Sequence, residues 1–212
     1  MKTVKLYTEM VIATAQKHLV TVEPRFIPLI ERHGPCVLVR ESRGIDIYQS
    51  LMSSILYQQL STKAAATIEE RFYALFPGEV RPPADKVALM TTEEFRAVGV
   101  SRQKASYLQD LASKYETIPL QSELESMSNE DIISRLIPIK GIGKWSVEML
   151  LMFTLGRLDV LPIDDMGVQE GIRRFLELET RPKPKEMHAL AESWAPYRSV
   201  GSWYMWRLLE NS

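Results

Sequence analysis

Apolar residues recur every three or four positions along nearly the whole chain, and the alternation typical of strands is absent. Four segments carry the clearest stripes: Ile47, Leu51, Ile55; Ala65, Ile68, Phe72, Leu75; Ala105, Leu108, Ala112, Tyr115; and Val168, Ile172, Phe175, Leu176. An amphipathic α-helix buries residues at this spacing on one face. Because prolines and glycines interrupt the stripes at short intervals, we expect an all-α protein of about ten helices with short connections.

Helix starts are marked by side chains that can accept a hydrogen bond from the first turn. The expected N-cap residues are Ser61, Thr91, Ser101, Ser128, and Asp164 or Asp165. These positions follow the breaks in the apolar pattern, so the helical segments and their starts agree with one another.

Composition narrows the classes of protein. With 212 residues, of which 45% are hydrophobic and 25% charged, the chain can bury a substantial core. No apolar run approaches the roughly 20 residues of a membrane span, and Lys17 and His18 interrupt any signal-like start. We therefore expect no membrane association and a cytoplasmic protein. The formal net charge of −1 gives no overall attraction to nucleic acid.

The single cysteine, Cys36, limits the cofactors that the chain can hold. One thiol cannot form an internal disulfide, and it cannot by itself supply the several thiolates of an iron–sulfur cluster or a structural zinc site. We therefore expect no iron–sulfur cluster.

The stretch LIPIKGIGKWSVEML, residues 136–150, places two glycines and two lysines directly before an apolar run. We expect one helix to end at Leu136–Ile137, a hairpin over 138–143, and a second helix over Trp145–Phe153. Gly141 and Gly143 allow a sharp turn that exposes the first amides of the second helix.

Exposed amides at a helix start form an anion site, to which Lys140 and Lys144 add positive charge. This helix-hairpin-helix suits one phosphate of a DNA backbone. Carbonyl groups on the other side of the hairpin, those of Ile137, Ile139 and Ile142, could hold a monovalent cation, Na⁺ or K⁺. The alternative is that the two glycines merely form a turn between two core helices.

Four motifs, in order, carry a resemblance to a known family. They are SSILYQQLSTKAAATIEERF, SRQKASYLQDLA, IKGIGKWSVEMLLMF with DVLPIDDMGVQEGIRRF, and WAPYRSVGSWYMW. Together they resemble the helix-hairpin-helix (HhH-GPD) DNA glycosylase superfamily, in the branch of 3-methyladenine DNA glycosylase II. The resemblance covers residues 46–206. It implies an enzyme of base excision repair that acts on damaged double-stranded DNA, in the nucleoid of a bacterium or in the nucleus of a eukaryote. It also implies no cofactor for the chemistry and no obligatory protein partner.

The resemblance also implies an organisation in two helical lobes that flank an active-site cleft. A single glycosylase fold would cover residues 1–212, in a short form without the N-terminal β domain of longer relatives. The first lobe would span about residues 45–165, including the helix-hairpin-helix at 130–154. The second would combine residues 1–44, which are expected to form two helices, with residues 166–212.

By the same resemblance, Asp165 is the catalytic residue. Such enzymes rotate a damaged nucleotide out of the duplex and break the bond between sugar and base. Positive charge then develops on the sugar, and a carboxylate beside it lowers the barrier and helps to position the attacking water. Asp164 would cap the following helix or support the loop. The alternative is that both aspartates only cap that helix.

Trp145 indicates the type of reaction. In superfamily members that also cut the DNA backbone, a lysine two positions after the second hairpin glycine forms a Schiff base with the sugar. Here that position holds Trp145, and Lys144 lies one residue earlier, about 100° away around a helix. The sequence therefore predicts a monofunctional glycosylase without lyase activity.

The resemblance places Trp145 and Trp206 where the family presents aromatic walls to the flipped base. Alkylation at purine N3 or N7 puts positive charge on the base, which favours contact with aromatic faces. Met149 and Met166 stand where some relatives have tyrosine, and they would make the pocket softer. We expect 3-methyladenine as the first substrate, with 7-methylguanine, 3-methylguanine and 1,N6-ethenoadenine as additional candidates. For Trp194 and Trp203 we expect packing in the core.

Gln59 aligns with the family's wedge, the side chain that fills the gap left by the flipped nucleotide, and Gln58 is the alternative. The two glutamines could instead satisfy buried backbone groups at the corner. The expected phosphate-binding surface consists of Gly141, Gly143, Lys140, Lys144, Ser61, Lys63 and Lys104, with Arg102 nearby. Two other functions remain open: a non-catalytic helix-hairpin-helix protein that binds DNA or senses damage, and a helical protein-interaction domain.

Overall fold

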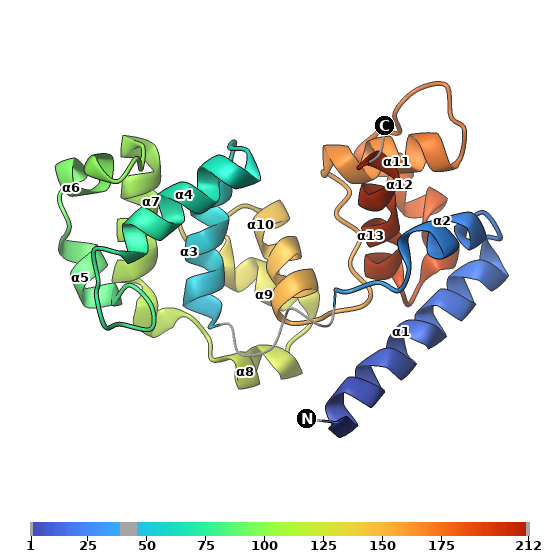
Figure 1. The fold of residues 1–212 in the computed structure, drawn as a ribbon, viewed down its shortest axis with the longest axis horizontal. Helices are drawn as coiled ribbons and strands as arrows, with labels where there is room; N and C mark the ends of the chain where they lie inside the picture. The colour runs from blue at the N-terminus through green and yellow to red at the C-terminus, as the bar shows by residue number, and fades with distance from the viewer. Residues whose placement is uncertain (1, 39–45, 211–212) are drawn as a thin grey trace. The chain divides into compact units, whose positions relative to one another are not determined.

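The computed structural model describes residues 2–38 and 46–210, and all regular elements in these ranges are helical (Figure 1). The predicted all-α fold is therefore confirmed. The chain divides into two compact units. The central unit is Gly44–Leu150, and the terminal unit combines Met1–Arg43 with Leu151–Ser212.

The boundary predicted near residue 165 was wrong, because residues 151–165 belong to the terminal unit. Side-chain contacts explain the difference. The ring of Phe153 stacks on Trp206 with 5.8 Å between centroids, and Ser199 donates a hydrogen bond to the Arg157 carbonyl. The predicted boundary between residues 44 and 45 lies outside the described residues. A cleft between the two lobes stays a prediction.

In the central unit, helix α7 lies at the centre and packs against α3, α5 and α6. The residues of its stripe, Ala105, Leu108 and Ala112, are buried as predicted. The elements of this unit are α3 (Ile47–Tyr57), α4 (Thr62–Tyr73), α5 (Ala84–Leu89), α6 (Thr92–Ala97), α7 (Arg102–Ser113), the 3₁₀ turn η1 (Tyr115–Thr117), α8 (Gln121–Ser126), α9 (Asn129–Leu136) and α10 (Lys144–Met149).

In the terminal unit, helix α13 is the core element and packs against α1, α2 and α11. Trp194 and Trp203 are buried, which confirms the expectation that both pack in the core. Helices α11 and α13 approach so closely that a Cβ added to Gly171 would lie 2.6 Å from the Met205 carbonyl oxygen. The elements are α1 (Lys2–Val22), α2 (Phe26–His33), α11 (Met166–Phe175), α12 (Pro184–Leu190), the 3₁₀ turn η3 (Glu192–Trp194) and α13 (Arg198–Leu209).

A π-helical turn, η2 (Leu150–Thr154), follows α10 directly. The second helix of the hairpin was predicted over Trp145–Phe153, whereas the α-helix begins at Lys144 and ends at Met149. Apolar residues continue without a break from Met149 to Phe153, across the end of α10, so hydrophobicity alone does not reveal the change of helix type. The structure describes thirteen α-helices rather than about ten, because α5, α6, α8 and α12 are too short to show a stripe in the sequence.

The predicted N-caps are confirmed, and each accepts a hydrogen bond from the third residue beyond it. They are Ser61, Thr91, Ser101, Ser128 and Asp165. Among the described residues, no helix combines the length and the apolar character that crossing a membrane would require.

Candidate functional site

Asp165 lies at the N-terminus of α11 and is held there by two hydrogen bonds to one carboxylate oxygen. Oδ1 accepts the Val168 amide at 2.8 Å and the indole nitrogen of Trp206 at 2.9 Å. The side chain is half-buried, and its charge lies at the positive end of the helix dipole. Asp165 therefore caps the helix, as the alternative interpretation proposed, and also contacts a predicted pocket residue.

The loop that leads to Asp165 is fastened to the start of α13. Arg198 donates two hydrogen bonds to the carboxylate of Asp159, at 2.6 and 2.7 Å, and holds the pKa of that carboxyl below its usual range. Ser199 accepts a bond from the Val160 amide and donates one to the Arg157 carbonyl. The same helix thus anchors the loop at its start and carries Trp206 near its end.

Three neighbours complete the surroundings of Asp165 in the terminal unit. Asp164 is exposed, and of the two predicted cap residues, Asp164 and Asp165, it is Asp165 that caps α11. Met166 begins α11 and is 64% exposed. Phe153 stacks on the Trp206 ring, with an interplanar angle of 29°. The sequence interpretation missed Phe153, because it lies within an apolar run that looks like ordinary core.

The hairpin between α9 and α10 requires glycine at residue 141. Gly141 has φ +80°, and a Cβ there would lie only 2.2 Å from a ring carbon of Tyr107. Gly143 is the N-cap of α10 and forms no side-chain cap, so the first amides of α10 have no competing acceptor from the cap residue. The glycine cap, which has no side chain to cover them, is the local reason to expect these amides to be exposed.

Residues at the end of helix α7 hold the hairpin by hydrogen bonds to its backbone. Asp110 accepts the backbone amide of Lys140 at 2.8 Å, and Lys114 bonds both Asp110 and the Pro138 carbonyl, at 2.7 and 2.9 Å. Burial alone would raise the pKa of the Asp110 carboxyl, but the bonds from Lys114 and from the Lys140 amide lower it overall. Asp110 is therefore a charged anchor for the hairpin backbone.

The side chains around the hairpin point partly to solvent. Lys140 is exposed, and Lys144 is exposed while lying 3.7 Å from the buried carboxylate of Glu148. Trp145 is 41% exposed in the first turn of α10. Met149, one helical turn later, is half-buried. Binding of a monovalent cation by the carbonyls of Ile137, Ile139 and Ile142 stays a prediction.

The two glutamines that follow α3 have different environments. Gln58 is the C-cap of α3 and donates its amide to the Gly141 carbonyl at 2.7 Å, so it satisfies a hairpin backbone group. Gln59 is exposed with φ +55°, a left-handed conformation that is uncommon for a residue with a side chain. Leu60 beside it is 41% exposed. Of the two wedge candidates, Gln59 is the exposed one, and Leu60 is a neighbour that the sequence interpretation missed.

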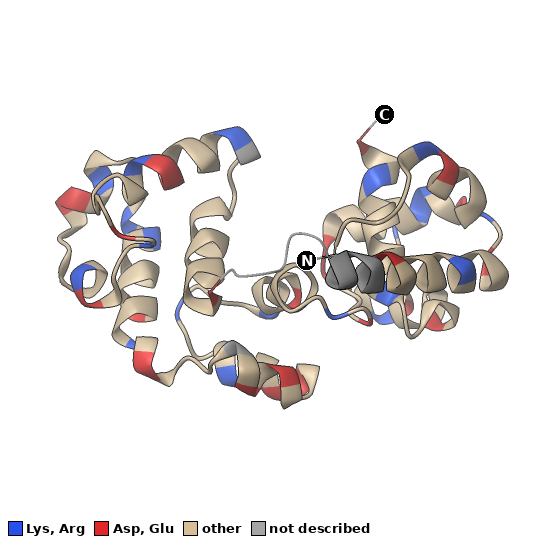
Figure 2. Ribbon diagram, turned by 60° about the horizontal axis from the view of Figure 1, so that its bottom comes forward, with Lys and Arg blue, Asp and Glu red and all other residues tan. Residues whose placement is uncertain are grey.

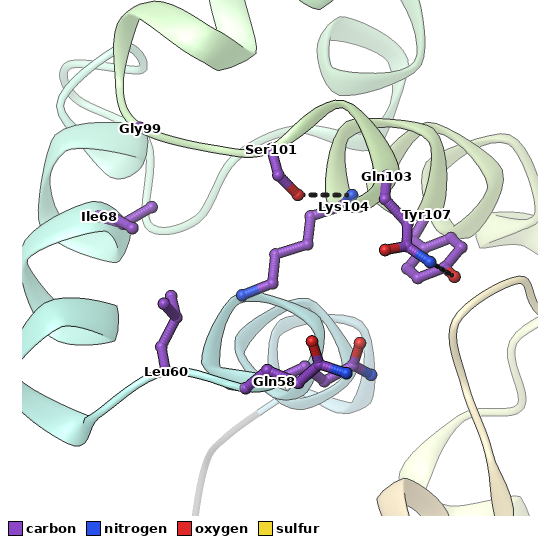
Figure 3. A pocket seen from close by; sticks show the side chains of 9 residues that line it. Gln58, Leu60, Ile68, Gly99, Ser101, Gln103, Lys104 and Tyr107 are labelled. Carbon is purple, nitrogen blue, oxygen red and sulfur yellow. Dashed lines mark hydrogen bonds between the residues drawn. The ribbon is translucent and has the colours of Figure 1, made fainter.

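A pocket of about 300 Å³ lies beside this corner, between the end of α3 and the start of α7 (Figure 3). Lys104 reaches across it and donates its ammonium to the Leu56 carbonyl at 2.6 Å, and burial lowers the pKa of this ammonium. Lys104 therefore stabilises the end of α3 in this structure, and its predicted contact with a phosphate stays a prediction. Gln59 and Leu60 line the same pocket.

Charges of both signs are intermixed over each unit (Figure 2), in keeping with the net charge of −1. Ser61 and Lys63 are exposed at the start of α4, directly after the corner at Gln59. Cys36 is buried, and burial raises the pKa of its thiol to about 12. Among the described residues, His, Cys, Asp and Glu side chains form no group of three or more that could bind a metal.

Two separate groups of predicted site residues are thus assembled. In the terminal unit, Asp165, Trp206 and Met166 lie together at the start of α11. In the central unit, Gln58 joins the corner at Gln59 to the hairpin. Trp145 and Met149 belong to the central unit, so their contribution to one base pocket with Trp206 stays a prediction.

Comparison with known proteins shows the family to which the chain belongs. A family model described as HhH-GPD superfamily base excision DNA repair protein matches residues 52–196. DNA-3-methyladenine glycosylase 1 of Schizosaccharomyces pombe is 36% identical over 91% of this chain and 86% of its own length. The alkylbase DNA glycosidase-like protein mag2 of the same organism is 31% identical over 92% of both chains.

Solved structures show the same fold. The structure of the S. pombe 3-methyladenine DNA glycosylase Mag1, in complex with abasic DNA, has a TM-score of 0.78 and 34% identity, covering 92% of this chain and 95% of that one. A DNA-3-methyladenine glycosidase from Bacillus halodurans has a TM-score of 0.75 and 35% identity, covering 91% and 88%. The chain therefore belongs to the HhH-GPD superfamily of base excision DNA repair proteins.

Proposed function

We propose that this chain is a monofunctional DNA glycosylase that hydrolyses the N-glycosidic bond of alkylated purines in double-stranded DNA. The observation that carries the proposal is the carboxylate of Asp165, held at the start of α11 by Val168 and Trp206 in a member of this superfamily. The names of the similar proteins, which describe glycosylases of 3-methyladenine, support the same substrate class.

In the proposed reaction, the bond between C1′ of the sugar and the purine nitrogen breaks after the nucleotide has left the duplex. For a base alkylated at N3 or N7, the bonding electrons go to the cationic base, which departs neutral, whereas neutral 1,N6-ethenoadenine must also take up a proton from solvent to leave as a neutral base. Positive charge on the sugar is stabilised by the negative charge of Asp165. A water oxygen then bonds to C1′ and transfers its proton to the Asp165 carboxylate, and an abasic site remains.

The absence of lyase activity is part of the proposal. A lyase of this family needs an amine at the position occupied here by Trp145, and an indole cannot form a Schiff base. Lys144, the residue before Trp145, lies about 100° away from it around the helix. The ammonium of Lys144 lies 3.7 Å from the Glu148 carboxylate. The DNA strand should therefore stay unbroken after the base has left.

The proposed base pocket contains Trp206 and Trp145, with Met166 and Met149 as softer walls. Aromatic faces attract a cationic purine, and Phe153 supports the Trp206 ring from one side. We propose 3-methyladenine as the principal substrate. The related bases 7-methylguanine, 3-methylguanine and 1,N6-ethenoadenine are the additional candidates.

The proposed DNA contacts lie in the central unit. The first amides of α10, with Lys140 and Lys144, would bind one backbone phosphate. Na⁺ or K⁺ on the carbonyls of Ile137, Ile139 and Ile142, on the other side of the hairpin, would add a further positive charge near the DNA. The exposed Gln59, with Leu60 beside it, would enter the minor groove and replace the flipped base.

The test is incubation of the protein alone with methylated double-stranded DNA, followed by chromatography of the released bases. Free 3-methyladenine from the parent protein, with an intact strand until alkali is added, supports the proposal. Trapping of a covalent complex by borohydride would contradict the monofunctional assignment. Tight binding to abasic DNA without base release would indicate a damage sensor, and no preference for abasic DNA would indicate an interaction domain.

A further inference from the structure

Gln58 connects two segments that are 83 positions apart in the chain. Its side-chain amide donates to the Gly141 carbonyl at 2.7 Å, and both residues belong to the central unit. Gln58 is half-buried and ends α3, while Gly141 lies at the tip of the hairpin between α9 and α10. The contact therefore joins the corner after α3 to the hairpin.

The acceptor of this bond has a fixed direction. Gly141 adopts φ +80° above the ring of Tyr107, and the preceding amide, that of Lys140, is held by Asp110 at 2.8 Å. The peptide group that contains this carbonyl is also held, because its amide, that of Ile142, donates to the Ile139 carbonyl at 3.0 Å. Gln58 is thus bonded to a rigid part of the unit.

The residue after Gln58 is the one exposed to solvent in an unusual conformation. Gln59 has φ +55°, and such a backbone persists only where its surroundings hold it. The bond of Gln58 restrains the residue directly before this turn, from which Gln59 and Leu60 follow in the chain. Figure 3 shows Gln58 at the end of α3, at the edge of the pocket that Gln59 and Leu60 also line.

We propose that Gln58 is a positioning residue that couples the wedge corner, Gln59–Leu60, to the phosphate-binding hairpin, residues 138–143. The inference rests on the proposed function, in which these two segments contact the same DNA. With the bond in place, the two contacts form as one rigid unit. Without it, each segment contacts DNA independently. Gln58 itself does not enter the groove.

The coupling is measurable by a mutant cycle on binding to a duplex that contains an abasic-site analogue. The two single changes are Gln59→Ala and Lys140→Ala, and the cycle is carried out with Gln58 and again with Gln58→Met. Methionine has a similar length but no donor. With Gln58, the double variant should lose less affinity than the product of the two single losses, by about threefold or more. With Gln58→Met, the affinity loss of the double variant should equal the product of the two single losses.

The matched control is Gln109→Met. Gln109 donates its amide to the Met90 carbonyl at 2.7 Å, so it is the same kind of bond elsewhere in the central unit. If the role of Gln58 is purely structural, the coupling between Gln59→Ala and Lys140→Ala should be the same in the parent protein, in Gln58→Met and in Gln109→Met. That result would overturn the proposal. The proposal would also be overturned if, in the parent background, the double variant lost affinity by the full product of the two single losses.

Thermal unfolding of each variant separates coupling from loss of fold, since Gln58→Met and Gln109→Met should shift the melting temperature similarly. The mutant cycle measures only the affinity for DNA and is independent of base release. If the parent protein binds abasic DNA with the predicted coupling but releases no base, the catalytic proposal fails while the inference about Gln58 holds. If base is released but the cycle is the same in every background, only the inference about Gln58 fails.

Discussion

The indole nitrogen of Trp206 donates a hydrogen bond to Oδ1 of Asp165 across 2.9 Å, and the two residues are 41 positions apart in the chain. The same oxygen accepts the amide of Val168 at 2.8 Å. Two donors on one oxygen fix the rotation of the carboxylate. Trp206 can therefore act in two ways, as a wall for a flipped base and as a support for the carboxylate, and substitutions can separate the two.

Asp165→Asn should abolish most base release while preserving the fold. Asparagine keeps an oxygen for Val168 and Trp206, and it is as good an N-cap as aspartate, so the free energy of unfolding should change by less than about 1 kcal/mol. The charge beside the cationic sugar is lost, which should slow excision about 10²–10³-fold or more. Single-turnover release of 3-methyladenine measures the effect. Asp164→Asn is the control, and it should retain measurable activity because Asp164 is exposed and does not cap α11.

Trp206→Phe and Trp206→Ala should differ in activity. Phenylalanine keeps an aromatic face against Phe153 but lacks the donor to Asp165, so we expect excision to slow by about tenfold. Alanine removes both and should slow excision further. Affinity for abasic DNA, which has no base to stack, should fall less than excision in both variants. Equal losses of binding and excision would mean that Trp206 is only a core residue.

Gly141→Ala should destabilise the central unit, whereas Gly143→Ala should not. A methyl group at residue 141 would collide with Tyr107 at 2.2 Å and would stand on a backbone with φ +80°. Overpacking and a left-handed alanine together should cost about 2–4 kcal/mol. At Gly143 no atom lies within 4 Å of the added carbon. Thermal unfolding compares the two variants, and equal melting temperatures would contradict the packing argument.

Arg198→Gln should make stability less dependent on acid. Arg198 lowers the pKa of the Asp159 carboxyl by hydrogen bonding, so the pair stabilises the fold above the unfolded pKa of about 3.9. That contribution is lost as the pH falls through the lower, folded pKa. We expect the variant to lose about 1 kcal/mol at pH 7, because the pair is partly exposed, and to approach the parent below about pH 4.

Denaturant unfolding at several pH values measures this difference. Lys86→Gln is the control, since the ion pair of Lys86 with Glu79 is exposed and should show no comparable trend. Because the Asp159 loop leads to Asp165, excision by the Arg198→Gln variant should also slow. A constant deficit in stability from pH 7 to pH 3 would contradict the assigned role of the pair.

The sequence by itself determined the features that depend on neighbours in the chain. The stripes on α3, α7 and α11, and the caps at Ser61, Ser101 and Asp165, follow from helical periodicity and from a hydrogen bond that spans three residues. The turn at Gly141 was also predictable, because a left-handed backbone favours glycine. The motifs predicted the family for the same reason, since each is a short contiguous segment.

Only the tertiary structure decided which distant groups meet. From the sequence we predicted that Lys104 is a positive charge available to DNA phosphates. In the structure its ammonium donates a hydrogen bond to the Leu56 carbonyl. Gln58 and Gln59 are identical neighbours, but one bonds the hairpin and the other is exposed. The bond between Trp206 and Asp165 likewise depends on the packing of α13 against α11. Such contacts arise from the way helices pack, and helical periodicity specifies which face is buried but not which polar partner that face will meet.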